Sequence, residues 1–169
     1  KIVWLIVGDG KKLSWLKSEV KKLNIENKFI FYGSYTSKYM PFFYSQADLL
    51  FVSLLKGNAF SKTIPAKIQT YLAFGKPIIG FLAGEGAKII SESKSGFTCE
   101  PGNISELKKI ILLIYNMKEN KRKLLSKNGK KLTISHTWSN THVDHANSLA
   151  NYKTLLLSLI FLAAFLRKC

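Results

Sequence analysis

The sequence predicts an α/β fold, a Rossmann-like parallel sheet with helices on both faces, and two observations carry this prediction. Short apolar runs such as IVWLIV, residues Ile2 to Val7, are continuous, as in strands that are buried on both sides. They alternate with segments whose apolar residues recur three or four positions apart, which is the period of a helix face. Strands and helices in alternation favour a parallel sheet between two helical layers.

The elements can be justified in order along the chain. After the first run, Leu13, Leu16, Val20 and Leu23 form one helix face. A further helix is expected in TIPAKIQTYLAFGKP, where a proline suits the start and Gly75 marks the stop. A third follows in the sequence EGAKIISES. The expected strands cover residues 2–7, 28–33, 48–54, 76–82 and 95–102, and we expect the sheet to be complete by Pro101.

The rest of the chain is expected to be helical. One helix is predicted from Leu107 to Met117 and a strongly basic one around residues 124–132. We therefore divide the chain into a nucleotide-sugar-binding domain, residues 1–132, and a C-terminal helical tail, residues 133–169. The tail has a possible helix at 143–153 and an apolar end at 155–166, too short to span a bilayer. This end either packs on a domain, which we favour, or anchors at an anionic membrane surface.

Composition limits the kind of partner. The formal net charge of +16 and the pI near 9.9 favour anionic partners: polyanions, anionic lipids or phosphorylated small molecules. Two cysteines, Cys99 and Cys169, offer no disulfide framework, which predicts a cytoplasmic setting. The chain begins without Met inside a strand-like run, so we expect it to be part of a longer protein.

The start of the helix in TIPAKIQTYLAFGKP is unusually cationic. It gathers Ser61, Lys62, Thr63 and Lys67, whereas a first helical turn normally favours Asp or Glu. A helix N-terminus with lysines and hydroxyls suits an anion such as a diphosphate. The simpler interpretation is that Ser61 or Thr63 only caps the helix and that the lysines are solvated.

Two glycine-bearing turns are expected at the same edge of the sheet as this helix start. They are VGDG, residues Val7 to Gly10, and AGEGAK, residues Ala83 to Lys88. Turns at the carboxyl ends of parallel strands line the crevice where ligands bind in such sheets. The complete dinucleotide fingerprint is absent, so a nicotinamide site is not predicted.

The ordered motifs resemble one family. IVGDGKKLSWLKSEVKKL, then TIPAKIQTYLAFGKPIIG, then GEGAKIISESKSGFTCEPGN resemble the C-terminal, donor-nucleotide domain of family 4 glycosyltransferases with the GT-B fold, over roughly Ile2 to Gly129. The TIPAKIQTYLAFGKP form is most similar to bacterial transferases of surface-polysaccharide and O-antigen assembly. The resemblance implies transfer of a sugar, for example an N-acetylated deoxyhexose, with retention of configuration to a lipid-linked or polysaccharide acceptor.

The resemblance also implies a site. Ser61, Lys62, Thr63 and Lys67 would bind the donor diphosphate. Gly8, Gly10, Tyr35 and Thr70 would line the nucleotide pocket. The donor would be a UDP-sugar in preference to a GDP-sugar, with no cofactor, no metal and no nucleic acid. Lys62 and Thr70 stand where many members carry glutamates, which removes two charged acceptors.

The resemblance also implies that part of the active site lies outside this chain. The catalytic residues and the acceptor-binding N-terminal domain are expected upstream, so this chain alone is expected to be inactive. The whole protein would then be a peripheral enzyme at the inner face of the cell membrane, where basic segments meet anionic lipid.

Other interpretations remain open. One alternative is a non-catalytic nucleotide-binding or interaction fragment from a truncated gene, and another, from the charge alone, is a nucleic-acid binder. His142 and His145 have a spacing that zinc sites use, but surface histidines are favoured because further ligands are lacking. The aromatic run from Tyr39 to Tyr44 is expected to pack in the core instead of stacking on bases.

Overall fold

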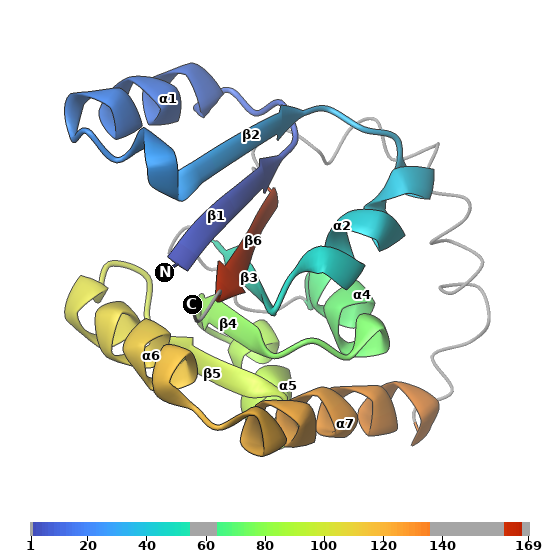
Figure 1. The fold of residues 1–169 in the computed structure, drawn as a ribbon. Helices are drawn as coiled ribbons and strands as arrows, with labels where there is room; N and C mark the ends of the chain where they lie inside the picture. Colours follow the sequence, from blue (N-terminus) through green and yellow to red (C-terminus); the bar gives the residue numbers. More distant parts are fainter. Residues whose placement is uncertain (1, 55–63, 136–160, 167–169) are drawn as a thin grey trace.

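The computed structural model describes residues 2–54, 64–135 and 161–166, and in these residues six strands form one sheet (Figure 1). The strands lie in the order β2-β1-β6-β3-β4-β5. β1 is paired in parallel with β2, and β3 and β5 are paired in parallel with β4. The strand bounds are β1 Ile2–Val7, β2 Phe29–Gly33, β3 Leu49–Ser53, β4 Ile78–Phe81, β5 Gly96–Cys99 and β6 Phe161–Leu166.

Helices connect the strands much as the alternation predicts. α1 follows β1, α4 lies between β3 and β4, and α5 lies between β4 and β5. α6 and α7 follow β5 and run along one side of the molecule (Figure 1). The bounds are α1 Leu13–Lys22, α2 Met40–Gln46, α4 Ala66–Phe74, α5 Glu85–Glu92, α6 Ile104–Asn116 and α7 Glu119–Ser135, with short 3-10 turns η1 Glu26–Lys28 and η2 Ser37–Tyr39.

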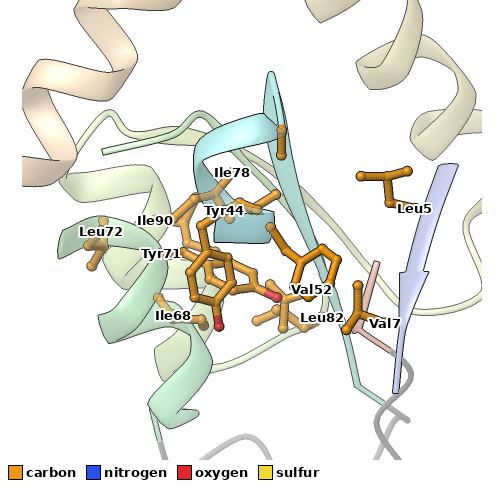
Figure 2. Close-up of a cluster of buried hydrophobic side chains, with 13 residues drawn as sticks. Leu5, Val7, Tyr44, Val52, Ile68, Tyr71, Leu72, Ile78, Leu82 and Ile90 are labelled. Atoms are coloured by element: carbon orange, nitrogen blue, oxygen red, sulfur yellow. The ribbon is translucent and has the colours of Figure 1, made fainter. Parts of the chain in front are cut away.

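Side chains from both faces of the sheet enter separate cores. Along β3, Leu50 and Val52 pack with α2, α4 and α5, whereas Leu49 and Phe51 pack with α6. The first cluster is drawn in Figure 2, where Tyr44 of α2 and Tyr71 of α4 lie at its centre. This alternation is the period-two pattern of a strand buried on both faces. The predicted fold class is therefore confirmed.

The sheet differs from the prediction at its centre. It is not complete by Pro101, because residues 161–166, expected to be the end of a helical tail, form β6. β6 runs antiparallel to both of its neighbours, β1 and β3. A short apolar run does not by itself distinguish helix from strand, and here pairing with two open strand edges decides. The division of the chain at residue 132 stays a prediction.

The predicted helix faces hold only in part. Ile68, Tyr71 and Leu72 of α4 are buried, as expected, but Leu23 lies just beyond α1 and is 62% exposed. In the aromatic run, Phe43 and Tyr44 are buried while Tyr39 and Phe42 are exposed. The core-packing interpretation is thus right for two of these four rings.

The described residues contain neither a candidate membrane span nor a candidate metal site. No helix among them is long and apolar enough to cross a membrane. Within the same residues, no group of three or more His, Cys, Asp or Glu side chains is placed to hold a metal ion. The possible helix at 143–153 and the histidines His142 and His145 lie outside the described residues.

Candidate functional site

The predicted site lies at the carboxyl edge of the parallel strands. There the backbone N–H of Gly8 donates to the carbonyl of Gly33 over 2.8 Å, which joins the turns after β1 and β2. Both glycines have positive φ angles, 131° and 74°, which side-chain-bearing residues rarely adopt. The carbonyl of Gly10 accepts from the N–H of Leu13 at the start of α1. Because the N–H of Gly8 is already bonded to Gly33, Gly8 shapes the turn and does not offer this N–H to a ligand.

The start of α4 has few groups of its own to balance its positive end. Pro65 precedes the helix and offers no side-chain acceptor, although its carbonyl accepts from the N–H of Ile68 over 2.9 Å. The first turn contains no acidic residue. A helix N-terminus of this kind retains its partial positive charge. Ser61, Lys62 and Thr63 lie outside the described residues, so their predicted diphosphate contacts stay predictions.

Lys67 is the cationic side chain that the structure places in this first turn. It is partly buried, and loss of hydration lowers the pKa of its ammonium group to about 8. Its neighbour Ile68 is fully buried in the core shown in Figure 2, which fixes the turn against the sheet. A desolvated ammonium at a positive helix end gains more from an anion than a solvated one does.

The start of α5 lies against the start of α4, and Gly86 makes this possible. A Cβ atom on Gly86 would lie 2.9 Å from the Cδ1 atoms of Ile68 and Leu82 and 3.2 Å from Cδ of Pro65. α5 follows Gly84, which has no side chain to cap it, and its first turn carries the acidic Glu85. Two helix starts therefore meet at one place, and of the two only α4 lacks an acidic residue in its first turn. The sequence signal was the second glycine of GEGAK, which the sequence indicated only as part of a strand-to-helix turn at the crevice.

Thr70 and Tyr35 occupy different surroundings. Thr70 is half-buried one turn after Lys67, and its hydroxyl donates to the carbonyl of Ala66 over 3.2 Å, so it can offer only an acceptor to a ligand. Tyr35 is 47% exposed and its ring centroid lies 4.9 Å from that of Phe43 in an edge contact. The structure thus places Thr70 beside Lys67 on one helix and Tyr35 in an aromatic cluster with α2.

A groove on α6 was not predicted from the sequence. It is an open apolar groove of about 190 Å³ that runs along α6. Leu107 and Ile111, which line it, also belong to the core that contains Ile2 and Trp4 of β1. The full lining is Ile104, Leu107, Lys108, Ile111 and Leu112. This groove has no cluster of polar groups to orient a nucleotide, so it is not part of the candidate site.

Solved structures share this fold. HepE from Anabaena, solved in complex with UDP-glucose, superposes with a TM-score of 0.66 at 22% identity over 86% of this chain and 39% of its own. WaaG, a glycosyltransferase involved in lipopolysaccharide biosynthesis, gives a TM-score of 0.66 at 13% identity over 87% of this chain and 38% of its own. The C-terminal domain of LpcC from Francisella tularensis gives 0.58 at 22% identity, over 75% and 64%. At these identities the likeness shows the GT-B fold.

Sequence comparison is more specific. An uncharacterized glycosyltransferase from Haemophilus influenzae is 30% identical over 115 residues, which are 68% of this chain and 31% of that protein. The chain therefore spans about a third of the length of this curated relative. The sequence profile described as glycosyl transferases group 1 matches residues 1–132. On this evidence the chain belongs to the group 1 glycosyltransferase family.

Proposed function

We propose that this chain is the donor-binding part of a retaining glycosyltransferase and that a UDP-sugar binds at the start of α4. The observation that carries the proposal is the partly desolvated Lys67 in a first turn without an acidic residue, next to a second helix start. A diphosphate supplies the negative charge that such a place favours. The complexes of HepE with UDP and with UDP-glucose support a uridine donor.

The chemistry that follows is electrostatic. When the bond between the sugar and the diphosphate breaks, negative charge develops on the departing diphosphate. Lys67 and the start of α4 would stabilise that charge without moving, which is how fixed dipoles lower a barrier. The acceptor-binding and catalytic groups would come from the remainder of the protein, since the chain spans 31% of its curated relative and 39% of HepE.

The acceptor in this proposal is a lipid-linked or polysaccharide chain, and the sugar is a hexose or an N-acetylated deoxyhexose. The relation to WaaG, a protein of lipopolysaccharide biosynthesis, supports a surface-polysaccharide role. Such an acceptor would hold the enzyme at the inner face of the cell membrane. Residues 104–133 carry nine lysine or arginine side chains against two glutamates, and Leu113 and Leu124 are exposed there. A basic surface with exposed leucines suits anionic lipid.

A thermal-shift titration of the chain with UDP, GDP and ADP tests the proposal. At about 100 times its dissociation constant, a ligand adds about 2.7 kcal/mol, which for a chain of this size is about 5 to 10 °C in Tm. We expect UDP to give this shift and GDP and ADP to give less. A folded chain that responds to none of them would favour the alternative, a non-catalytic interaction fragment.

Membrane association is tested separately by sedimentation with vesicles. We expect the chain to pellet with vesicles of phosphatidylglycerol and not with phosphatidylcholine. Replacing both Leu113 and Leu124 by serine should weaken this binding. Equal binding to both vesicle types, or none to either, would contradict the membrane part of the proposal and leave the nucleotide part intact.

A further inference from the structure

β6 is the exception in the sheet. The described strand pairs that do not involve β6 are all parallel, whereas β6 is antiparallel to both β1 and β3 (Figure 1). Its pairing is also unequal: six residue pairs join it to β1 and three join it to β3. The strand therefore fits the edge of β1 better than the edge of β3.

The position that β6 occupies is the switch point of the sheet. From it, β1 and β2 follow one another outward on one side, and β3, β4 and β5 follow one another outward on the other. In a doubly wound sheet with this order, the strand at the switch point is parallel to its neighbours and comes first in the chain. A parallel strand preceding β1 would complete that order, and β6, the last strand in the chain, does not.

β1 and β3, the strands on either side of this position, are buried as strands at the centre of a sheet are. Leu5, Ile6 and Val7 of β1 and Leu49 and Leu50 of β3 are each at most 2% exposed. Buried strands need hydrogen-bond partners along both edges, because an unpaired backbone group away from water is costly. Some strand must therefore fill this position, and an apolar one is required.

The connection from such a strand to β1 would need a helix, and the fold indicates where it would lie. Successive right-handed crossovers in the same direction pack on the same face of a sheet. α1, which leads from β1 to β2, lies on the same face of the sheet as α6. The Nζ atom of Lys17 in α1 lies 5.5 Å from the ring centroid of Phe31. Phe31 is paired with Ile6, and both point to the face where Trp4 packs with α6. The helix before β1 would join α1 and α6 there.

That face offers an apolar surface for the helix. The groove on α6 is lined by Leu107 and Ile111, which pack with Ile2 and Trp4 of β1, and both β1 residues are only partly buried. Ile104 is 64% exposed and Leu112 is 46% exposed beside them. A helix that reaches β1 from the switch point would pass this groove and cover it.

We propose that the position between β1 and β3 accepts an apolar strand parallel to both, that the polypeptide on the N-terminal side of Lys1 supplies it, and that β6 holds the position in its absence. The length of the relatives supports a source outside this chain, which spans 31% of the curated relative and 39% of HepE. The helix that follows the strand occupies the groove on α6.

The exchange changes the candidate site. A parallel strand has its carboxyl end, and the turn that follows, at the same edge as Gly8 and the start of α4. β6 instead begins at this edge, with Phe161 opposite Val7. The crevice beside Lys67 therefore gains a strand-to-helix turn only in the longer protein.

Hydrogen exchange tests the proposal on two proteins: the chain of 169 residues and the protein extended through the polypeptide that precedes Lys1. In the chain, we expect the amides of residues 161–166 to be protected. In the longer protein, we expect them to exchange freely, while β1 and β3 stay protected in both. Protection of 161–166 in both lengths or in neither, or a gene without coding sequence upstream, would overturn the proposal.

A proline substitution gives a second measurement. Ala163 pairs with both Leu5 and Leu50, so Ala163→Pro removes a backbone donor at the centre of the sheet. We expect Tm to fall by about 6 to 12 °C in the chain and to stay within about 2 °C in the longer protein. Ala163→Ser, which keeps the donor, and Ile79→Pro in β4, which should lower Tm in both lengths, are the controls. An equal fall in both lengths would contradict the exchange.

Discussion

The starts of α4 and α6 differ in how the partial positive charge of the helix N-terminus is balanced. At α6, the side chain of Asn103 accepts from the N–H of Glu106 over 3.0 Å, and Glu106 itself brings a negative charge to the first turn. At α4, Pro65 has no side-chain acceptor to cap the helix, the first turn holds no acidic residue and Lys67 adds a positive charge. One helix is balanced by its own residues, and the other has a positive end that an anion would balance. The difference indicates where function, and not stability, has shaped the sequence.

Removing the charge at α4 should have the largest effect. In Lys67→Met we expect the dissociation constant for UDP to rise about 10- to 150-fold, the loss of one charge-assisted hydrogen bond. Because burial of the charge opposes folding, the nucleotide-free Tm should be at least as high as in the wild type. Calorimetric titration with UDP measures the first and a melting curve the second. Lys127→Met, an exposed lysine on α7, is the charge-matched control and should bind UDP normally.

Separating the two helix starts should have the next largest effect. Gly86→Ala places a methyl group 2.9 Å from Ile68 and Leu82, and such overpacking costs about 1 to 3 kcal/mol. This exceeds the gain of about 0.5 to 1 kcal/mol that alanine brings to a helix. We expect weaker UDP binding together with lower stability in urea. Gly129→Ala on α7, whose nearest neighbours would lie at 3.4 Å, is the matched control, and a similar loss there would contradict this explanation.

A change of pH should weaken the α4 site without any substitution. The pKa of Lys67 is lowered to about 8, so in the free protein this side chain loses its proton as the pH rises through that value. We expect UDP affinity to fall by up to about tenfold between pH 7 and pH 9. The same profile measured on Lys67→Met should be flat across this interval. A parallel fall in the variant would assign the titration to another group.

Removing the cap at α6 should have the smallest effect and leave binding untouched. Asn103→Ala exposes the N–H of Glu106, which costs about 1 kcal/mol or about 2 to 4 °C in Tm for a chain of this size. The dissociation constant for UDP should not change. A changed dissociation constant would show that the start of α6 influences UDP binding, and it would contradict the assignment of binding to the start of α4 alone.

The sequence predicted those parts of the fold that depend on local pattern. The five parallel strands and the helix that ends at Gly75 were recognisable because apolar runs, helical periods and a left-handed glycine are local signals. β6 was not, because six apolar residues suit either a strand or a helix, and their pairing partners lie more than a hundred residues away. Leu23 was expected on a buried face, yet lies past the end of α1.

The candidate site was predictable in part for the same reason. Lys67 follows from its place in a helix start, but its burial depends on the packing of α4 against β4 and α5. The role of Gly86 depends on two helices that are distant in sequence. The aromatic contacts of Tyr35 depend on how α2 folds back beside β2. Such tertiary contacts leave no periodic trace in the sequence.

If the start of α4 binds an anion at Lys67, the NMR signal of the Lys67 side chain should report the bound anion as the pH is varied. Carbon-13 lysine labelling, with the signal assigned by its loss in Lys67→Arg, gives the pKa of this group with and without UDP. We expect a pKa of about 8 in the free chain and a clear rise when UDP binds, because a neighbouring anion favours the ammonium form. A pKa that is the same at saturating UDP would contradict anion binding at Lys67.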